Sequence, residues 1–120
     1  MTWKVLFHDE FAAEFEQLPS YVQDELLAYV KLLQQVGYQL KRPHSDTLNG
    51  SQHSNMKELR FKVKNGVWRV AYAFDPQRQA ILLVAGDKTG ISQKRFYKQL
   101  IAKADRRFNA HLRQLREKGE

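Results

Sequence analysis

The sequence predicts an α+β fold, in which helices pack on one face of a twisted antiparallel sheet. Three observations indicate it: apolar residues at helical spacing in the first third of the chain, an Asn-Gly turn between two strand-like runs in the middle, and a long helical pattern at the end. At 120 residues the chain is long enough for a hydrophobic core but too short to divide into two domains. We therefore expect a single domain over residues 1–120.

The chain opens with a short strand and a first helix. Residues 3–7 (WKVLF) mix apolar and basic side chains in the way that a short, partly covered strand does. Apolar side chains then recur at helical spacing over residues 11–18, until Pro19 interrupts the pattern. We expect one helix between these two boundaries.

A second helix follows at once, which makes a helical hairpin. Ser20 and Gln23 have the spacing of a capping box, and the apolar pattern continues to Gly37, where we expect the helix to end. Residues 38–56 contain proline, glycine, two histidines and many small polar side chains. This composition predicts a surface loop.

The hairpin over residues 57–74 is the strongest local signal. Asn65-Gly66 is the preferred dipeptide for a two-residue turn in which both residues need positive φ. With that turn, Lys62 pairs with Arg69 and Arg60 pairs with Ala71. One face is then apolar and contributes to the core, through Leu59, Phe61, Val63, Trp68 and Val70. The other face carries the cations Arg60, Lys62, Lys64 and Arg69.

A third strand and a final helix complete the predicted fold. Residues 80–85 (AILLVA) are apolar at every position, which is typical of a covered central strand and extends the hairpin to a three-stranded antiparallel meander. Ser92 caps a helix whose apolar pattern continues to Leu115. The charged tail after Arg116 is expected to be loose.

Charge divides the chain into two unlike halves. Residues 1–56 carry four Lys/Arg against seven Asp/Glu, a net charge of −3, whereas residues 57–120 carry sixteen against six, a net charge of +10. A basic half of this kind attracts polyanions, although it is also compatible with a solvated helix face. The absence of cysteine excludes a disulfide framework and thiolate metal ligands, and it favours a cytoplasmic location.

Export and membrane anchoring are not expected. The acidic pair Asp9-Glu10 stands where a signal peptide would need its apolar core. The chain also has no apolar run of membrane-spanning length.

The basic face of the hairpin is a candidate site for RNA cleavage. Metal-free cleavage needs a base for the 2′-hydroxyl, an acid for the leaving oxygen and positive charge around the phosphate. Arg60 and Arg69 offer guanidinium forks that match phosphate oxygens, and Lys88 joins them if its strand lies beside the hairpin. The simpler alternative is that these cations only solvate an exposed sheet. We prefer the site, because cations with no acid beyond Glu58 among them would otherwise repel one another.

Two tyrosines have different predicted roles. Tyr97 lies at the start of the last helix among basic residues, where it can meet a base or a phosphate, and it completes the predicted catalytic set. Tyr72 falls on the apolar face and is expected to be a core tyrosine with a bonded hydroxyl. The cations that we expect to bind RNA are Lys57, Lys62, Lys64, Lys94, Arg95 and Lys98.

No metal or other cofactor is expected. The carboxylates before the tail of the basic half are spread over four predicted elements, at Glu58, Asp75, Asp87 and Asp105. His44 and His53 lie in the predicted loop, where a histidine can act as a general base but is more often simply solvated.

Three stretches of the chain resemble the HigB-like branch of the RelE/ParE toxin superfamily. They are KELRFKVKNGVWRVAYAFD, ILLVAGDKTG and SQKRFYKQLIAKAD, and PHSDTLNG before the hairpin is also similar. The resemblance covers nearly the whole chain, and its pieces are specific as a set: ELR, WR, an apolar strand ending in a lysine, and a basic last helix.

The resemblance implies a toxin that cleaves translated mRNA on the ribosome without a metal, and that a cognate helix-turn-helix antitoxin holds silent. It carries over Arg60, Arg69 and Lys88 as phosphate and transition-state residues, and leaves the acid and the base open. Two alternatives remain on the same fold: a ParE-like inhibitor of DNA gyrase without nuclease activity, and an inactive nucleic-acid-binding remnant.

Overall fold

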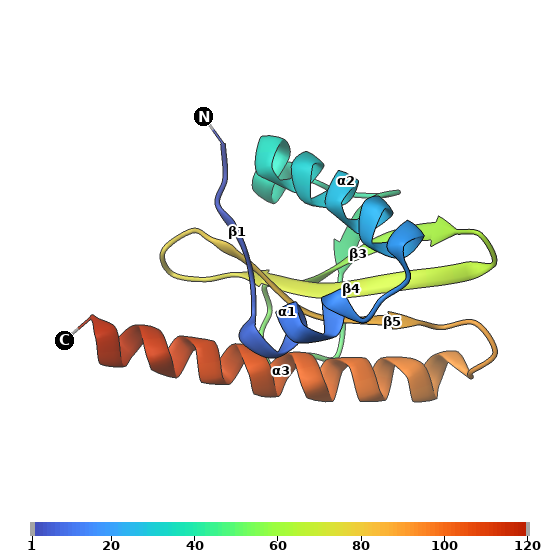
Figure 1. Ribbon diagram of the computed structural model, residues 1–120. Helices are drawn as coiled ribbons and strands as arrows, with labels where there is room; N and C mark the ends of the chain where they lie inside the picture. The colour runs from blue at the N-terminus through green and yellow to red at the C-terminus, as the bar shows by residue number, and fades with distance from the viewer. Residues whose placement is uncertain (1, 120) are drawn as a thin grey trace.

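The computed structural model describes residues 2–119, which form one five-stranded sheet and its covering helices (Figure 1). In chain order the elements are β1 (Val5–Phe7), α1 (Asp9–Glu16), α2 (Ser20–Val36), the 3₁₀ turn η1 (Gly37–Gln39), β2 (Ser45–Thr47), β3 (Met56–Val63), β4 (Gly66–Phe74), β5 (Ala80–Asp87) and α3 (Gln93–Lys118). The strand order is β1-β5-β4-β3-β2. β1 runs parallel to β5, and all other neighbours are antiparallel. The predicted α+β class is confirmed. Strand β2 was not predicted, so the antiparallel part of the sheet has four strands, β2 to β5, where a three-stranded meander was expected.

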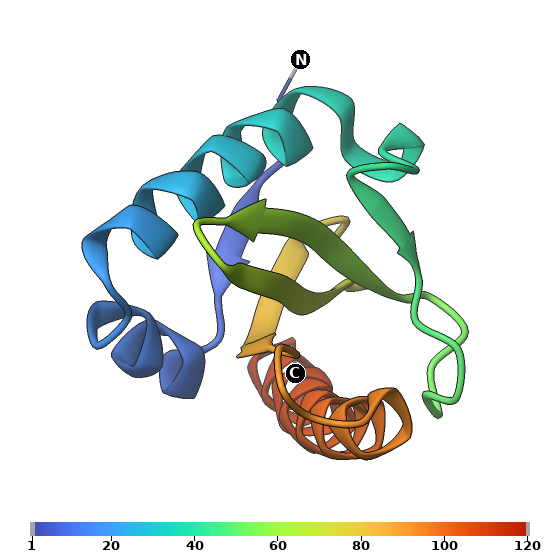
Figure 2. The same ribbon diagram turned by 90° about the vertical axis from the view of Figure 1, so that its right-hand side faces the viewer.

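Helices cover both faces of the sheet, which corrects the expectation of one covered face. Figures 1 and 2 show α2 on one side of the sheet and α3 on the other. α1 and α2 bury Phe11, Leu26 and Leu33 against the β3–β4 face that carries Leu59 and Tyr72. The second core lies under α3 and contains Ala71, Ala73, Ile81, Leu83, Phe96, Leu100 and Phe108.

Small residues on the α3 side of the sheet explain this second core. Ala71 and Ala73 leave room for the helix to approach β4 closely. Gly86 does the same in β5, because a Cβ there would lie 2.9 Å from the ring of Phe96. The cations of the hairpin had indicated that this face is exposed. It is not, because α3 covers the part of the face that carries Ala71 and Ala73.

The hairpin turns one residue earlier than the Asn-Gly signal predicts. Val63 pairs with Gly66, so the two-residue loop is Lys64-Asn65, and only Lys64 has positive φ, at 53°. The predicted pairing was therefore wrong by two residues. Because side chains alternate along a strand, a two-residue change keeps every side chain of β3 and β4 on its predicted face, and only Lys64, now in the turn, leaves it. It also places Arg60 directly opposite Arg69.

Gly66 is required for packing rather than for a turn. A Cβ at this position would lie 2.6 Å from Nε1 of Trp68, which is too close for any side chain. The glycine therefore allows the indole to lie over the strand end. The Asn-Gly pair does mark the hairpin, but the glycine is there to make room for Trp68 and not to provide positive φ in the turn.

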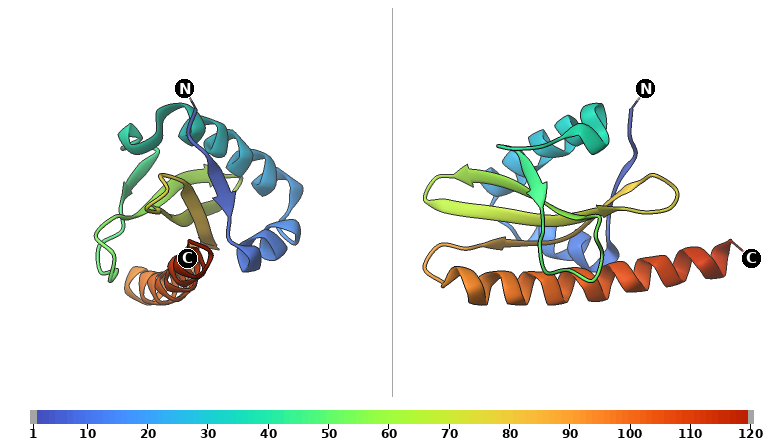
Figure 3. Two further views of the ribbon diagram at one scale, coloured as in Figure 1. Left: turned by 90° about the vertical axis from the view of Figure 1, so that its left-hand side faces the viewer. Right: turned by 180° about the vertical axis from the view of Figure 1, so that it is seen from behind.

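The predicted loop over residues 38–56 contains η1 and an edge strand, β2. Ser45 pairs with Leu59 on β3, and its buried hydroxyl bonds the Tyr72 hydroxyl at 2.6 Å. The expectation of a core tyrosine with a bonded hydroxyl is confirmed. After β2 the chain crosses to α3 (Figure 3), where the Asp105 carboxylate accepts from the Ser51 hydroxyl (2.5 Å) and the Gln52 amide (3.0 Å).

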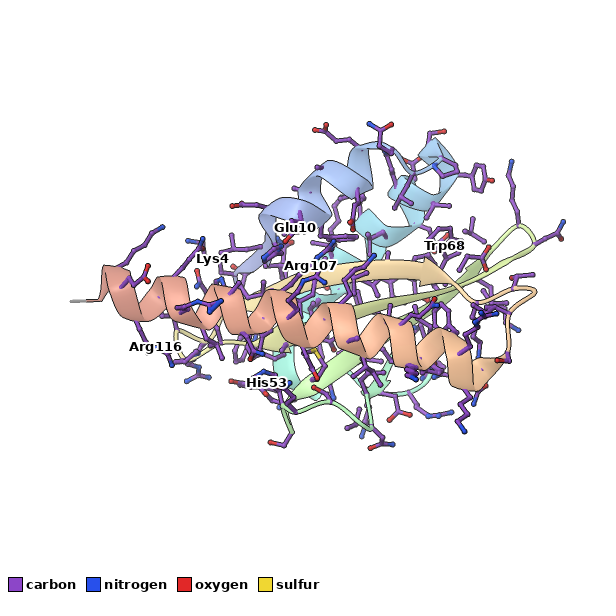
Figure 4. The ribbon with its side chains drawn as sticks, turned by 90° about the horizontal axis from the view of Figure 1, so that it is seen from below. Lys4, Glu10, His53, Trp68, Arg107 and Arg116 are labelled. Atoms are coloured by element: carbon purple, nitrogen blue, oxygen red, sulfur yellow. The ribbon has the colours of Figure 1, made fainter. Side chains whose placement is uncertain are left out.

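A buried arginine connects α1 to α3. Nη1 of Arg107 donates to Glu14 at 2.9 Å and to the carbonyl oxygen of Leu83 at 2.7 Å. Figure 4 shows Arg107 beside Glu10, with His53 on the opposite side of α3. The tail is also more ordered than expected, because α3 continues to Lys118. Among the described residues, no helix has the length and apolar character needed to cross a membrane.

Removing the Ser45 hydroxyl should destabilise the fold. We expect Ser45→Ala to lower the free energy of unfolding by about 1–3 kcal/mol, because it leaves the buried Tyr72 hydroxyl without its partner. Urea denaturation measures the change. The double variant with Tyr72→Phe should lose less than the sum of the two single variants. Strict additivity would show that the two hydroxyls do not depend on each other.

Candidate active site

A cleft of about 590 Å³ opens between the β2 region and the first turn of α3. Its floor is the α3 side of β3, where Glu58 and Arg60 lie. Gln93, Lys94 and Tyr97 of α3 form one wall, and the other wall comes from Arg42, Asp46, Thr47, Leu48 and Asn49. The cleft therefore needs both the edge of the sheet and the last helix.

A buried carboxylate lies at the centre of this site. Glu58 is 4% exposed. Its Oε2 accepts from Nη1 of Arg60 at 2.8 Å, and its Oε1 accepts from the Tyr97 hydroxyl at 2.8 Å. The site thus pairs a carboxylate with a phenol and a cation. Sequence reasoning missed Glu58 as a functional residue, although a lone acid in a basic strand is a usable signal.

Arg69 is buried, at 5% exposed, which corrects the expectation that it stands on an open face. Its Nε donates to the Tyr97 hydroxyl at 3.1 Å, and its Nη1 donates to the carbonyl oxygen of Trp68 at 3.0 Å. The Arg69 Nε also lies 3.8 Å from Glu58 Oε1. The covering helix explains this burial, because α3 brings Tyr97 onto the guanidinium. Arg69 therefore fixes the position of Tyr97.

Lys88 lies beside Tyr97, where the predicted strand arrangement would put it. Its Nζ is 5.9 Å from the centre of the Tyr97 ring and 3.5 Å from Oε1 of Gln93. Burial lowers the pKa of Lys88, and the charges of Arg69 and Arg60 lower it further. The lowered pKa makes it easier for this lysine to exchange a proton.

Tyr97 keeps its proton more strongly than an ordinary tyrosine. Burial raises its pKa, the hydrogen bond to Glu58 raises it further, and the hydrogen bond from Arg69 acts in the opposite direction. At neutral pH the phenol is therefore a proton donor. Within residues 2–119, no three His, Cys, Asp or Glu side chains gather in a group that could hold a metal ion.

The structure brings together only part of the predicted RNA-binding set. Lys94 lines the cleft. Lys62 lines a neighbouring cleft that also contains Arg60. Arg95 and Lys98 are exposed on α3 and line a shallow depression away from Glu58.

Two of the predicted lysines do not point toward the cleft. Lys57 shares the sheet face of Leu59 and Tyr72, on the α2 side. The early turn carries Lys64 to the same side, where its Nζ lies 4.0 Å from the centre of the Tyr21 ring. Neither lysine is placed to join Arg60.

The two loop histidines have separate surroundings. His53 bonds Asn109 at 2.8 Å and packs edge-on against Phe108, so it holds the loop to α3. His44 packs near Tyr29 and lines the same neighbouring cleft as Lys62. Neither histidine lines the cleft around Glu58.

Comparison with known proteins gives three kinds of likeness. The family described as "Phage derived protein Gp49-like (DUF891)" matches residues 13–109. "Putative toxin HigB2" of Mycobacterium tuberculosis is 42% identical over 94 residues, and "Putative toxin HigB3" of the same organism is 47% identical over 78 residues. These alignments cover 77% and 65% of this chain, but only 46% and 66% of the two relatives.

A solved structure of a mutant E. coli toxin RelE in the free state has a similar fold. The TM-score is 0.58 with 13% sequence identity, over 86% of this chain and 97% of that chain. At this identity the likeness concerns the fold alone.

Loss of Arg69 should cost more stability than loss of Arg60. We expect Arg69→Ala to lower the free energy of unfolding by about 3 kcal/mol, because it removes a partner from the buried Glu58 and Tyr97. Arg60→Ala is the comparison and should cost about 1.5 kcal/mol, because it removes one hydrogen bond from Glu58 while water can reach the vacated position, the Arg60 side chain being 23% exposed. Urea denaturation compares them. Equal losses would contradict a structural role specific to Arg69.

Proposed function

The chain belongs to the phage-derived Gp49-like family, and from this premise we propose that it is a HigB-like toxin of a toxin–antitoxin system that cleaves ribosome-bound mRNA without a metal. The observation that carries the proposal is the hydrogen bond between the buried Glu58 carboxylate and the Tyr97 hydroxyl, at a cleft lined by Arg60. The names of the two mycobacterial relatives support the toxin assignment. A helix-turn-helix antitoxin is the proposed partner, and the cytoplasm the proposed location.

The proposed reaction is attack of the RNA 2′-oxygen on the adjacent phosphorus. A bond forms between the 2′-oxygen and phosphorus, the bond from phosphorus to the 5′-oxygen breaks, and a cyclic phosphate results. Glu58 takes the proton of the 2′-hydroxyl, and Tyr97 gives its proton to the leaving 5′-oxygen. Arg60 and Lys88 stabilise the charge on the phosphoryl oxygens.

The contact between acid and base also returns the protons to their starting groups. After cleavage, Glu58 is protonated and Tyr97 is a phenolate. Their oxygens are hydrogen-bonded at 2.8 Å in the resting site. The proton therefore passes from Glu58 to Tyr97, and no other group is needed. Arg69 acts as a positioning residue in this scheme, because its Nε holds the Tyr97 oxygen from the other side.

Expression of the protein alone should arrest bacterial growth by stopping translation. Pulse labelling of a host after induction is expected to show loss of protein synthesis before loss of DNA synthesis. If DNA synthesis stops first while protein synthesis continues, the protein is a gyrase inhibitor. If neither stops, this chain is an inactive nucleic-acid-binding remnant.

Arg60→Ala should abolish growth arrest at equal expression. Removing a charge that stabilises the transition state costs about 3 kcal/mol, which is on the order of a hundredfold in rate. Growth curves with quantified protein levels measure the effect, and Lys31→Ala on the exposed side of α2 is the control. Arg60→Lys keeps the charge but loses the fork, and should also be impaired. Full toxicity of Arg60→Ala would remove this arginine from the mechanism.

A further inference from the structure

We propose that the neighbouring cleft, behind Arg60, binds the nucleobase next to the phosphate that Arg60 holds, with Tyr29 and His44 as its stacking surface. This inference rests on the proposed RNA substrate. It assigns a role to α2 and to the segment before β2, neither of which takes part in the chemistry described above.

The two clefts adjoin at Arg60. The second has a volume of about 410 Å³, and both Arg42 and Arg60 line each of them. A phosphate held at Arg60 therefore has Glu58 and Tyr97 on one side and the second cleft on the other. The sugar keeps each base close to its phosphate. The base next to a phosphate at Arg60 can therefore reach the second cleft.

The wall of the second cleft is aromatic. Tyr29 lies 5.1 Å from the ring of Phe61 at 34°, and 5.6 Å from the ring of His44 at 68°. Flat rings of this kind provide stacking surface for a base of any type. Tyr29 is only half-buried, and it packs against the α2 core from its inner side. Its remaining surface lines the cleft.

Cations complete the surroundings of this wall. Lys62 and Arg69 line the same cleft as Tyr29. A core aromatic ring needs no cations beside it. A nucleotide needs an aromatic ring for its base and a cation for its phosphate. This combination distinguishes the cleft from a simple gap at the edge of the core.

Hydrogen bonds hold the segment that carries His44 in place before any ligand binds. The backbone amide of Arg60 donates to the carbonyl oxygen of His44 at 2.9 Å. The backbone amide of His44 donates to the carbonyl oxygen of Lys41 at 3.0 Å. Nε of Arg42 donates to Asp46 at 2.9 Å. A rigid surface of this kind loses little freedom when a base stacks on it.

A binding experiment with small probes tests the inference without ribosomes. Adenosine 3′-monophosphate and ribose 5-phosphate share a sugar and a phosphate, but only the first has a base. We expect the wild-type protein to bind the nucleotide about tenfold more tightly, as measured by NMR titration. Tyr29→Leu should remove this preference and leave the affinity for ribose 5-phosphate unchanged. The matched control is Tyr21→Leu, an exposed tyrosine on the same helix, which should keep the preference.

Shifts of the His44 ring protons provide a second measurement that needs no substitution at Tyr29. They should move on addition of the nucleotide and stay in place on addition of ribose 5-phosphate. A wild-type protein without base preference, a Tyr29→Leu variant that keeps it, or unmoved His44 signals would each overturn the inference. Early loss of protein synthesis in the pulse-labelling experiment, together with any of these results, would leave the cleavage proposal intact. If the protein shows the base preference but does not arrest growth, the cleavage proposal fails and the base-binding inference stands.

Discussion

Burial of the Glu58 carboxylate sets the conditions for the rest of this site. A charged group with 4% exposure is stable only when hydrogen-bonded and paired, and here three side chains from two different parts of the chain do this. Tyr97 can reach the carboxylate only because α3 lies across the sheet. Arg69 in turn occupies the space between strand and helix. The same contacts that make the charge tolerable also fix a phenol and a carboxylate at hydrogen-bond distance.

The two helical layers differ in charge as well as in position. α1 and the first turns of α2 carry six acids and no lysine or arginine, whereas α3 carries nine lysines and arginines. The sheet separates α2 from α3, so the acids of α2 and the cations of α3 lie on opposite sides of it (Figure 2). α1 lies beside α3, where Arg107 bonds Glu14 (Figure 4). A polyanion therefore meets a field that directs it to α3 and the cleft, and away from α2.

Local patterns predicted the elements of this fold well, and failed where tertiary packing decided. The helices, the hairpin and the role of Tyr72 follow from spacing and turn residues that lie close together in the chain. The second core does not, because Ala71 and Ala73 are short side chains whose meaning depends on a helix more than twenty residues away. Arg69 was misplaced for the same reason, since alternation gives the face of a residue and not what covers it. Glu58 was visible as a lone acid, but its partner Tyr97 is 39 residues away.

The bonds from Ser51 and Gln52 to Asp105 join positions 54 and 53 residues apart. One wall of the cleft comes from residues in and around β2, and the other from α3, so neither wall forms a cleft by itself. These contacts can form only when both segments have been synthesised. While a ribosome is still making α3, the nascent chain has no site. The toxicity proposed for the finished protein is therefore withheld from its own synthesis by the order in which the chain emerges.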